Sequence, residues 1–205
     1  LQRLAPNIKW ALDDSGLTPN DLDAVAVSLG PGSFTGIRIG VTTAKGLAYA
    51  ADKKIIGLPT LDIFAAGVMA EPMDLIVPLL VARPGEVYNA IYRFDGKRPA
   101  KLTEDSALSI DELNDRILGL KPRRIVFCGP GSRANREAIE EHLGDKTVFT
   151  PTWADHPRGE IMGQLAAERF AAGQFDDAFS LVPLYVRRPT PEIRMESLKE
   201  AKKAK

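Results

Sequence analysis

The sequence predicts an α/β fold, in which strands and helices alternate along the chain. Apolar runs at residues 24–29 and 75–81 are typical of buried strands, and a third buried strand is predicted at residues 123–128. Helical patterns separate these runs, and two glycine-rich turns, at residues 30–33 and 129–132, each stand between a strand and a helix. This repeated strand–turn–helix order indicates a duplicated unit.

The first helix is predicted over residues 1–14, and Gly16 ends it. Apolar side chains recur at helical spacing and form one face of this helix. Trp10 projects from the opposite side, among charged residues. Such a ring is either a contact for a partner or a half-covered surface residue, and we favour the partner contact.

A glycine turn follows the first buried strand. With the start of the next helix, it comprises Gly30, Pro31, Gly32, Ser33 and Gly36. Glycine and proline end the strand because of their backbone preferences, and Ser33 or Thr35 is suited to cap the helix. Two interpretations stay open: a cradle for a phosphate at the helix N-terminus, or plain turn geometry. The turn is not a Walker loop, since Ile37 and Arg38 stand where that motif requires Lys and Ser or Thr.

The helix after this turn carries two faces that both avoid charge. The face predicted to meet the sheet comprises Ile37, Val41, Ala44, Ala48 and Ala51. The opposite face comprises Ile39, Thr43, Gly46 and Ala50, all small or apolar. A helix that only covers a sheet is expected to carry charged residues there. We therefore expect another helix or a partner subunit to cover this second face, and we predict an interface that includes Trp10.

Arg38 and Lys45 flank that helix; they either meet an acidic group of a partner or are solvated, and we expect both to be solvated. Further strands are predicted at residues 55–57, 86–94, 100–103 and 147–150, and residues 184–186 are predicted to be a short strand or an extended piece. Further helices are predicted at residues 60–70, 109–118, 135–143 and 158–172. Thr60 is expected to cap the helix at 60–70, and Ser109 and Glu112 form a predicted capping box.

The composition limits the function classes. Lys and Arg together number 27, and so do Asp and Glu, so the chain has no net charge with which to form a self-contained nucleic-acid surface. No apolar run reaches the roughly 18 residues of a spanning helix, and we expect a cytoplasmic protein without a membrane partner.

The sequence contains few of the residues from which catalytic or metal sites are usually built. His142 and His156 are the two histidines, and neither they nor Cys128 has the spacing of a metal site. Ser33 has no histidine near it in sequence, so we interpret it as a turn or cap residue. Cys128 ends an apolar run and is predicted to be a buried structural thiol. We predict no catalytic residues and no metal.

The run from Ser28 to Ala48 resembles the signature of the TsaB family of bacterial tRNA threonylcarbamoyladenosine biosynthesis proteins, also called YeaZ-like. Three shorter stretches fit the same family in the same order, at residues 56–61, 82–88 and 183–187. The resemblance covers most of the chain. The family has an acidic residue two positions before Arg83 in many members, and Val81 stands there in this chain.

The resemblance implies the actin-like ATPase (ribonuclease H-like) fold with two lobes. We place an N-terminal lobe at residues 1–72, a C-terminal lobe at 73–188 and a mobile, Lys-rich tail at 189–205. The family begins with a β-hairpin before the first helix, whereas this sequence starts at Leu1 within that helix. We therefore expect the hairpin to be missing from this chain.

The resemblance also implies a non-catalytic scaffold subunit in the modification of tRNA. The expected partners are a TsaD-like transferase subunit, a TsaE-like ATPase, tRNA through the complex and, in the absence of TsaD, a second copy. No cofactor is expected in the isolated chain, although ATP or ADP is a candidate ligand at the partner interface. TsaD carries a paired-histidine metal site, and this chain has no such histidine pair.

Two alternatives stay open. One is an ATP-dependent small-molecule kinase of the actin-like fold, which needs tight ATP binding by the isolated chain and a carboxylate base near the cleft. The other is a peptidase, which needs a metal site that the sequence does not provide.

Overall fold

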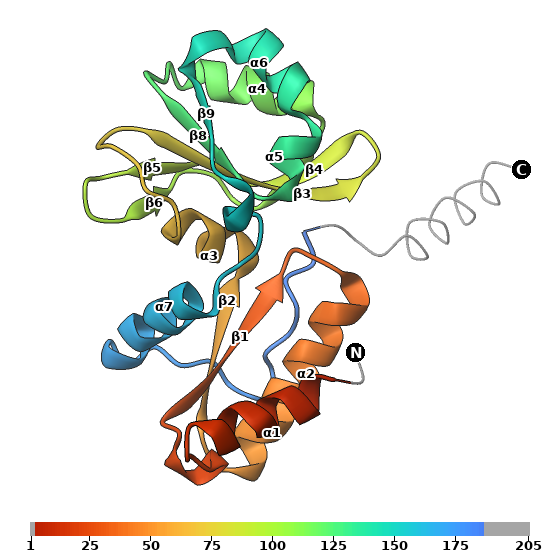
Figure 1. Cartoon of the computed structure of the whole chain (residues 1–205), viewed down its shortest axis with the longest axis vertical. Helices are drawn as coiled ribbons and strands as arrows, with labels where there is room; N and C mark the ends of the chain where they lie inside the picture. The colour runs from red at the N-terminus through yellow and green to blue at the C-terminus, as the bar shows by residue number, and fades with distance from the viewer. Residues whose placement is uncertain (1–2, 187–205) are drawn as a thin grey trace, which may run out of the picture.

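The computed structural model describes residues 3–186, and it contains two β-sheets with helices packed around them (Figure 1). The first part of the chain forms α1 (Leu4–Asp14), η1 (Pro19–Asp21), β1 (Ala24–Gly30), α2 (Phe34–Ala50), β2 (Lys54–Pro59) and α3 (Thr60–Ala66). A meander follows, with β3 (Leu75–Arg83), β4 (Glu86–Asn89), β5 (Tyr92–Phe94), β6 (Pro99–Lys101) and β7 (Ser106–Leu108). The last part forms α4 (Ile110–Gly119), β8 (Ile125–Cys128), α5 (Pro130–Ala134), α6 (Arg136–Leu143), η2 (Gly144–Lys146), β9 (Thr147–Phe149), η3 (Thr152–Ala154) and α7 (Gly159–Ala171).

The first sheet consists of β1 and β2, which are parallel and pair from Ala24 opposite Lys54 to Ser28 opposite Leu58. Both faces of this sheet are covered, as parallel strands require. On one face α2 packs its buried Val41 against Val27 and Ile55. On the other face α3 and α7 pack against the sheet (Figure 1).

The second sheet has seven strands and lies beyond α3 (Figure 1). Its centre is β3, which pairs antiparallel with β4 and β5 and parallel with β8; β9 then pairs parallel with β8. Helices α4 and α6 cover one face through buried side chains that include Leu113, Ile117 and Ile139. Gly129 lies between β8 and α5 and is the N-cap of α5, and a Cβ atom there would lie 2.6 Å from the Leu79 carbonyl oxygen.

Helix α3 joins the two sheets. Its Leu61, Phe64 and Ala65 pack against Ile76 and Cys128 of the second sheet, while Ile63 belongs to the core of the first. Burial raises the pKa of the Cys128 thiol, and the predicted structural role is confirmed by its full burial.

The chain returns to the first sheet after β9. Helix α7 packs on β2, and Asp176 forms an isolated bridge with Ile55. Residues 174–186 then run along the sheet and α2, as the blue segment of Figure 1 shows. The division at residue 72 stays a prediction. The predicted tail at 189–205 lies outside the described residues.

Several local predictions need correction. Pro59 precedes α3 as its N-cap, so Thr60 is the first helical residue and not the cap, and the helix ends at Ala66 rather than at residue 70. The predicted strand at 86–94 is two strands, and β7 was not predicted. The second glycine turn leads directly into α5 at Pro130, a helix that was not predicted, whereas the helix predicted at 135–143 is confirmed as α6. The capping box of Ser109 and Glu112 is confirmed.

Candidate protein-binding surface

In the glycine turn after β1, other parts of the chain lie so close to Gly30 that a larger residue would not fit. Gly30 has φ +107°, and a Cβ atom there would lie 2.9 Å from Ile37 Cδ1 and 3.2 Å from the Leu184 carbonyl oxygen. Ser33 is the N-cap of α2, and its hydroxyl oxygen accepts a hydrogen bond from the Gly36 amide at 3.3 Å. The cap interpretation of Ser33 is therefore confirmed. Whether the turn binds an anion stays a prediction.

The sheet-facing side of α2 matches the periodicity of the sequence. Val41, Ala44 and Ala48 are buried, and Ile37 packs at the edge of the same core. Gly40 lies above Val27, whose Cγ2 atom would be 4.0 Å from an added Cβ. Small residues thus let α2 lie close to β1.

A second side of α2 is covered by the C-terminal segment, residues 179–185, which we call the strap. Lys45 Nζ donates to the carbonyl oxygens of Phe179 at 3.0 Å and Leu181 at 2.9 Å. Arg38 Nε donates to the Tyr185 hydroxyl at 2.9 Å. Arg38 is exposed, as expected, whereas Lys45 is half-buried, and both side chains also hold the strap against α2, a role that was not predicted.

Aromatic rings mark both ends of the strap. The Arg38 guanidinium lies 4.1 Å from the centroid of the Phe34 ring, and Phe34 lies 5.6 Å from Tyr185. At the other end Tyr49 meets Phe179 edge-on at 5.7 Å, and these two rings are 71% and 77% exposed. Exposed aromatic and arginine side chains of this kind are typical of protein interfaces.

We expect the strap to loosen when Lys45 is replaced by Met, because the variant loses both charge-assisted hydrogen bonds. Amide exchange at residues 179–185 should accelerate by about tenfold or more, the factor that corresponds to about 1.4 kcal/mol. Lys53→Met is the matched control, since Lys53 Nζ also donates to a carbonyl oxygen, that of Asn20, far from the strap. Equal exchange in both variants would contradict the role of Lys45.

The predicted interface face of α2 is only partly covered within residues 3–186. Gly46 and Ala50 are exposed, whereas Ile39 and Thr43 are half-buried. No heavy atom outside its own helix backbone and chain neighbours lies within 4 Å of an added Gly46 Cβ. Thr43 borders a hollow of about 490 Å³ between α1 and α2, which Ile8 and Leu12 line from the other side. The open part of the predicted face is therefore Gly46 and Ala50. Together with the half-buried Ile39 and with Thr35 and Thr42, which are exposed next to it, these residues form a surface that we call the α2 open face.

Trp10 is 67% exposed and lies on α1. Ile8 and Leu12 of the same helix turn toward α2, where they line the hollow. Trp10 stands about 200° around the helix from Ile8, on the far side from that hollow. The structure thus places Trp10 and the α2 open face on different sides of the α1–α2 pair.

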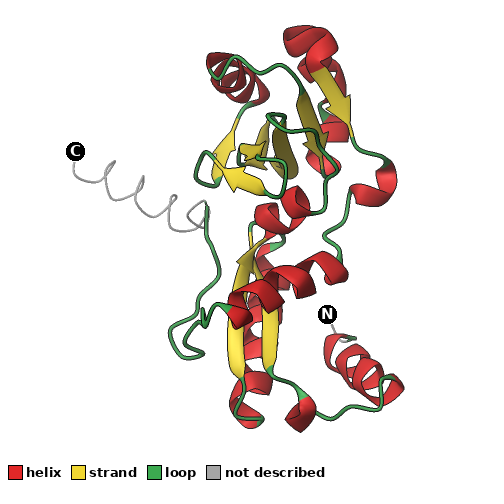
Figure 2. Ribbon diagram, turned by 90° about the vertical axis from the view of Figure 1, so that its left-hand side faces the viewer, coloured by secondary structure: helices red, strands yellow, loops and turns green. Residues whose placement is uncertain are grey.

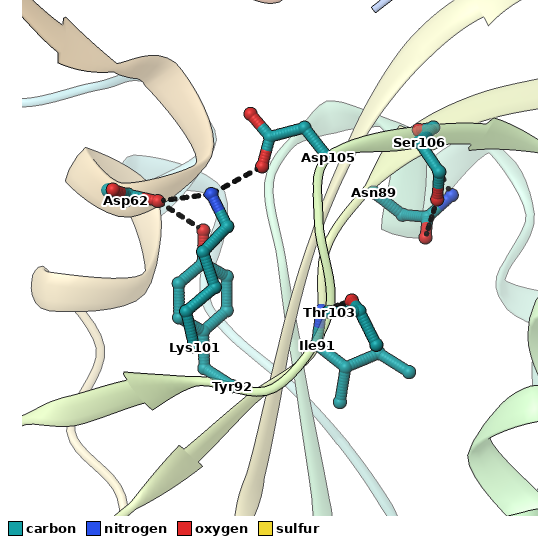
Figure 3. Close-up of polar contacts among 8 residues, drawn as sticks. All are labelled: Asp62, Asn89, Ile91, Tyr92, Lys101, Thr103, Asp105 and Ser106. Carbon is teal, nitrogen blue, oxygen red and sulfur yellow. Dashed lines mark hydrogen bonds and ion pairs between the residues drawn. The ribbon is translucent and has the colours of Figure 1, made fainter.

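A polar cluster that the sequence did not reveal fixes α3 to the second sheet (Figure 3). Asp62 of α3 accepts hydrogen bonds from the Tyr92 hydroxyl at 2.5 Å and from Lys101 Nζ at 2.9 Å. Lys101 also forms an ion pair with Asp105 at 2.5 Å, and the Asp105 side chain is only 6% exposed. One cation therefore balances two carboxylates from different parts of the chain.

Burial shifts the proton affinities in this cluster. Burial and the Asp62 charge raise the pKa of Tyr92. Burial also raises the pKa of Asp105 and outweighs the opposing effect of Lys101. For Lys101, burial lowers the pKa, but the hydrogen bonds to Asp105 and Asp62 outweigh it and the net pKa is raised.

A hollow of about 700 Å³ lies beside this cluster, between α3, α7 and the β5–β6 hairpin. Asp62, Tyr92 and Lys101 line it, so a carboxylate does stand at a pocket, as the kinase alternative requires. That carboxylate already accepts from both Tyr92 and Lys101. It is therefore poorly placed to act as a general base.

Within residues 3–186 there is no group of three or more His, Cys, Asp or Glu side chains that could hold a metal ion. Among the helices of the same residues, none combines the length and the apolar character needed to cross a membrane.

Comparison with known proteins gives three findings. The profile of the TsaD family, tRNA N6-adenosine threonylcarbamoyltransferase, matches residues 1–195. The Bacillus subtilis tRNA threonylcarbamoyladenosine biosynthesis protein TsaB is 34% identical over 194 residues, which cover 94% of this chain and 81% of that protein. The Escherichia coli protein of the same name is 32% identical over 190 residues, covering 91% of this chain and 80% of its own length.

Solved structures show the same fold. A Pseudomonas aeruginosa protein described as similar to peptidase YEAZ superposes with a TM-score of 0.71 at 24% identity, covering 91% of this chain and 83% of its own. YeaZ from Pseudomonas aeruginosa superposes with a TM-score of 0.68 at 24% identity, covering 89% and 83%. The two-sheet α/β architecture is thus the actin-like, ribonuclease H-like fold. With the sequence identities to the two TsaB proteins, these findings establish that the chain belongs to the TsaB (YeaZ-like) family of tRNA threonylcarbamoyladenosine biosynthesis proteins.

Proposed function

We propose that this chain is a non-catalytic scaffold subunit in threonylcarbamoyladenosine modification of tRNA, and that it binds a TsaD-like transferase subunit through α1 and α2. The observation that carries the proposal is the α2 open face. It runs along a helix whose other sides already meet the sheet, the strap and α1.

The chemistry of the α2 open face supports a protein partner. Its five residues are uncharged, although they include the exposed Gly46 and Ala50. Surface helices of soluble proteins normally turn charged side chains to water. Small side chains also let a second helix axis come close, and the exposed rings of Tyr49 and Phe179 stand at one end as candidate anchors.

The non-catalytic part of the proposal rests on the residues that chemistry would need. The Ser33 hydroxyl serves as a helix cap, and Asp62 is held by Tyr92 and Lys101. His142 lies on α6, where its Nδ1 is 3.3 Å from the Ala138 carbonyl oxygen, and His156 lies in the segment before α7. None of these groups stands as a free nucleophile beside a base.

The further partners follow from the family and stay predictions. They are a TsaE-like ATPase, tRNA bound through the complex, and a second copy when TsaD is absent. A nucleotide at the partner interface and a cytoplasmic location are also predictions. The equal numbers of cationic and anionic residues favour tRNA contact through the assembly rather than by this chain alone.

The experiment that tests the proposal is a mixing experiment with purified subunits. The chain and the TsaD-family subunit from the same organism are combined and followed by gel filtration with light scattering. We expect one species whose mass is that of a heteromer. Two separate peaks at micromolar concentrations would contradict the proposal.

Calorimetry with ATP and Mg²⁺ distinguishes the scaffold from the kinase alternative. We expect no saturable heat from the chain alone, because Asp62 and Lys101, two of the charged residues that line the pocket, already pair with each other. Tight, saturable binding of ATP by the chain alone would favour the kinase.

A further inference from the structure

The strap and the adjoining side of α2 form one surface with exposed aromatic rings at both ends. Phe34 and Tyr185 lie 5.6 Å apart at one end, and Tyr49 meets Phe179 edge-on at the other. Each pair joins a ring of α2 to a ring of the strap, and all four residues are exposed. We call this surface, with Arg38 between the rings of the first pair, the α2–strap surface.

The guanidinium of Arg38 is held in place but keeps donors to spare. Its Nε donates to the Tyr185 hydroxyl at 2.9 Å, and its Cζ lies 4.1 Å from the centroid of the Phe34 ring. Within residues 3–186 no carboxylate pairs with Arg38, and its terminal N–H groups have no acceptor. An arginine that is already ordered loses little freedom on binding, and its free edge suits a carboxylate that accepts two parallel hydrogen bonds.

The rings at the other end are not needed to hold the strap. Lys45 Nζ binds two carbonyl oxygens of the strap, and Leu181 is buried in the core of the first sheet. Tyr49 and Phe179, by contrast, keep 71% and 77% of their surface exposed. Large rings of this kind contribute most when a partner covers them.

The α2–strap surface continues the α2 open face and lies away from α1. Tyr49 follows Gly46 by three residues, and side chains at this spacing are neighbours on a helix. Arg38 and Leu47 are nine residues apart, which is about 180° around the helix, and Leu47 lines the hollow toward α1. Figure 2 shows the last described loop on one side of the two-stranded sheet and α1 on the other. The exposure of Arg38 therefore does not depend on what adjoins α1.

We propose that the TsaD-like subunit binds the α2–strap surface together with the α2 open face. A carboxylate of the partner pairs with Arg38, and an apolar side chain of the partner packs against Tyr49 and Phe179. Lys45 is a positioning residue, because it fixes the strap backbone beneath these contacts. This inference rests on the proposed function, since it names further contacts of the same partner.

The charge contact is tested with Arg38→Gln by titration calorimetry at two salt concentrations. At about 50 mM salt we expect affinity for the TsaD-family subunit to fall about tenfold or more. The variant should also lose part of the decrease in affinity that the unsubstituted chain shows at about 300 mM salt, because salt screens the ion pair. Arg38→Lys should restore binding only in part, since an ammonium group lacks the planar fork.

The matched control for the charge contact is Arg98→Gln. Arg98 is likewise exposed, but it lies between β5 and β6 of the second sheet. Both glutamine variants change the net charge by the same amount. Arg98→Gln should therefore keep the affinity and the salt dependence of the unsubstituted chain. A purely structural role of Arg38 would not change the salt dependence.

The aromatic contact is tested with Phe179→Ala, and Phe175→Ala is its control. Phe175 belongs to the same C-terminal segment and meets Phe170 edge-on at 5.3 Å, but it lies outside the strap. We expect Phe179→Ala to weaken binding about tenfold or more and Phe175→Ala to leave it unchanged. Lys45→Met, which loosens the strap, should also weaken binding. Urea unfolding of each variant shows that the chain stays folded.

The outcomes separate this inference from the proposed function. If the unsubstituted chain forms no heteromer, the proposed function and the inference both fall. If the heteromer forms but Arg38→Gln and Phe179→Ala bind as their controls do, only the inference is overturned. Normal affinity of a Lys45→Met chain with a loosened strap would also overturn it. So would a Phe179→Ala chain that loses stability by itself without losing affinity, because the chain would then cover the ring itself.

Discussion

Replacing Gly46 with Arg is expected to abolish binding of the TsaD-like subunit while the chain stays folded. The position is exposed, and an added Cβ meets nothing within 4 Å, so the monomer accepts the side chain. Arg is also a better helix former than Gly by roughly 0.7–1 kcal/mol. At a close helix–helix contact, however, the same side chain would be buried without a partner charge, and we expect affinity to fall about 100-fold or more.

The matched control for this variant is Gly163→Arg. Gly163 is likewise an exposed helical glycine with no atom within 4 Å of an added Cβ, but it lies on α7. Both variants gain the same charge and the same helix propensity. Titration calorimetry with the TsaD-family subunit should show lost binding for Gly46→Arg and full binding for Gly163→Arg. Equal affinities would remove the α2 open face from the interface.

Replacing Lys101 with Met is expected to cause the largest loss of stability. Lys101 is the cation between Asp62 and Asp105, and the Asp105 side chain is 6% exposed. Removing one partner of a buried pair leaves a charge without compensation, which costs about 3–5 kcal/mol in well-buried cases. The Lys101 side chain is 28% exposed, so we expect about 3 kcal/mol at pH 7, measured by urea unfolding.

The stability of the Lys101→Met variant should depend on pH. The folded-state pKa of Asp105 is already raised, and loss of Lys101 raises it further. The folded variant therefore binds a proton more tightly than the unfolded chain does, and its stability should recover as the pH falls toward 5. In the unsubstituted chain, the raised pKa of Lys101 makes stability depend on pH in the alkaline range. The stabilising contribution of Lys101 is complete below pH about 10.5, and it is lost as the pH rises through the folded-state pKa.

Lys97→Met on the same hairpin serves as the control, since Lys97 is exposed. It should change the free energy of unfolding by less than about 0.5 kcal/mol. The double variant Lys101→Met/Asp105→Asn should regain part of the stability, because it no longer buries an unpaired carboxylate. A Lys101→Met variant as stable as Lys97→Met would show that the cluster in Figure 3 does not hold α3 to the second sheet.

The α2 helix shows what periodicity can predict. Its buried face was predicted correctly because Val41, Ala44 and Ala48 repeat at the spacing of a helix. The roles of Arg38 and Lys45 were missed because their partners are 147 and 134 residues away in the sequence. No local pattern records which carbonyl oxygen the strap brings to Lys45.

The meander shows why strand boundaries were harder to predict. The apolar pattern continues through residues 86–94, yet the Ile91 amide donates to the Thr103 hydroxyl and its carbonyl oxygen accepts from the Leu102 amide. These contacts divide the run into β4 and β5. The four-residue spacing of Lys101 and Asp105 was the one sequence signal for the polar cluster, but Asp62 and Tyr92 join it only through tertiary structure.

The sequence identifies the candidate interface residues, but it does not show whether they share one surface. Trp10 and the α2 open face both stand out in the sequence because an apolar or small residue replaces an expected charge. The sequence does not reveal that Ile8 and Leu12 turn toward α2 and leave Trp10 on the far side. Trp10→Ala is thus expected to weaken a partner that wraps around α1 and to leave untouched a partner that meets only α2.

Sedimentation velocity on the chain mixed with the TsaD-family subunit from the same organism tests the central claim most directly. The scaffold account predicts a faster-sedimenting heteromer with the unsubstituted chain and with Gly163→Arg, and its loss with Gly46→Arg. Independent sedimentation of the two subunits, or a heteromer that persists unchanged in Gly46→Arg, would contradict it.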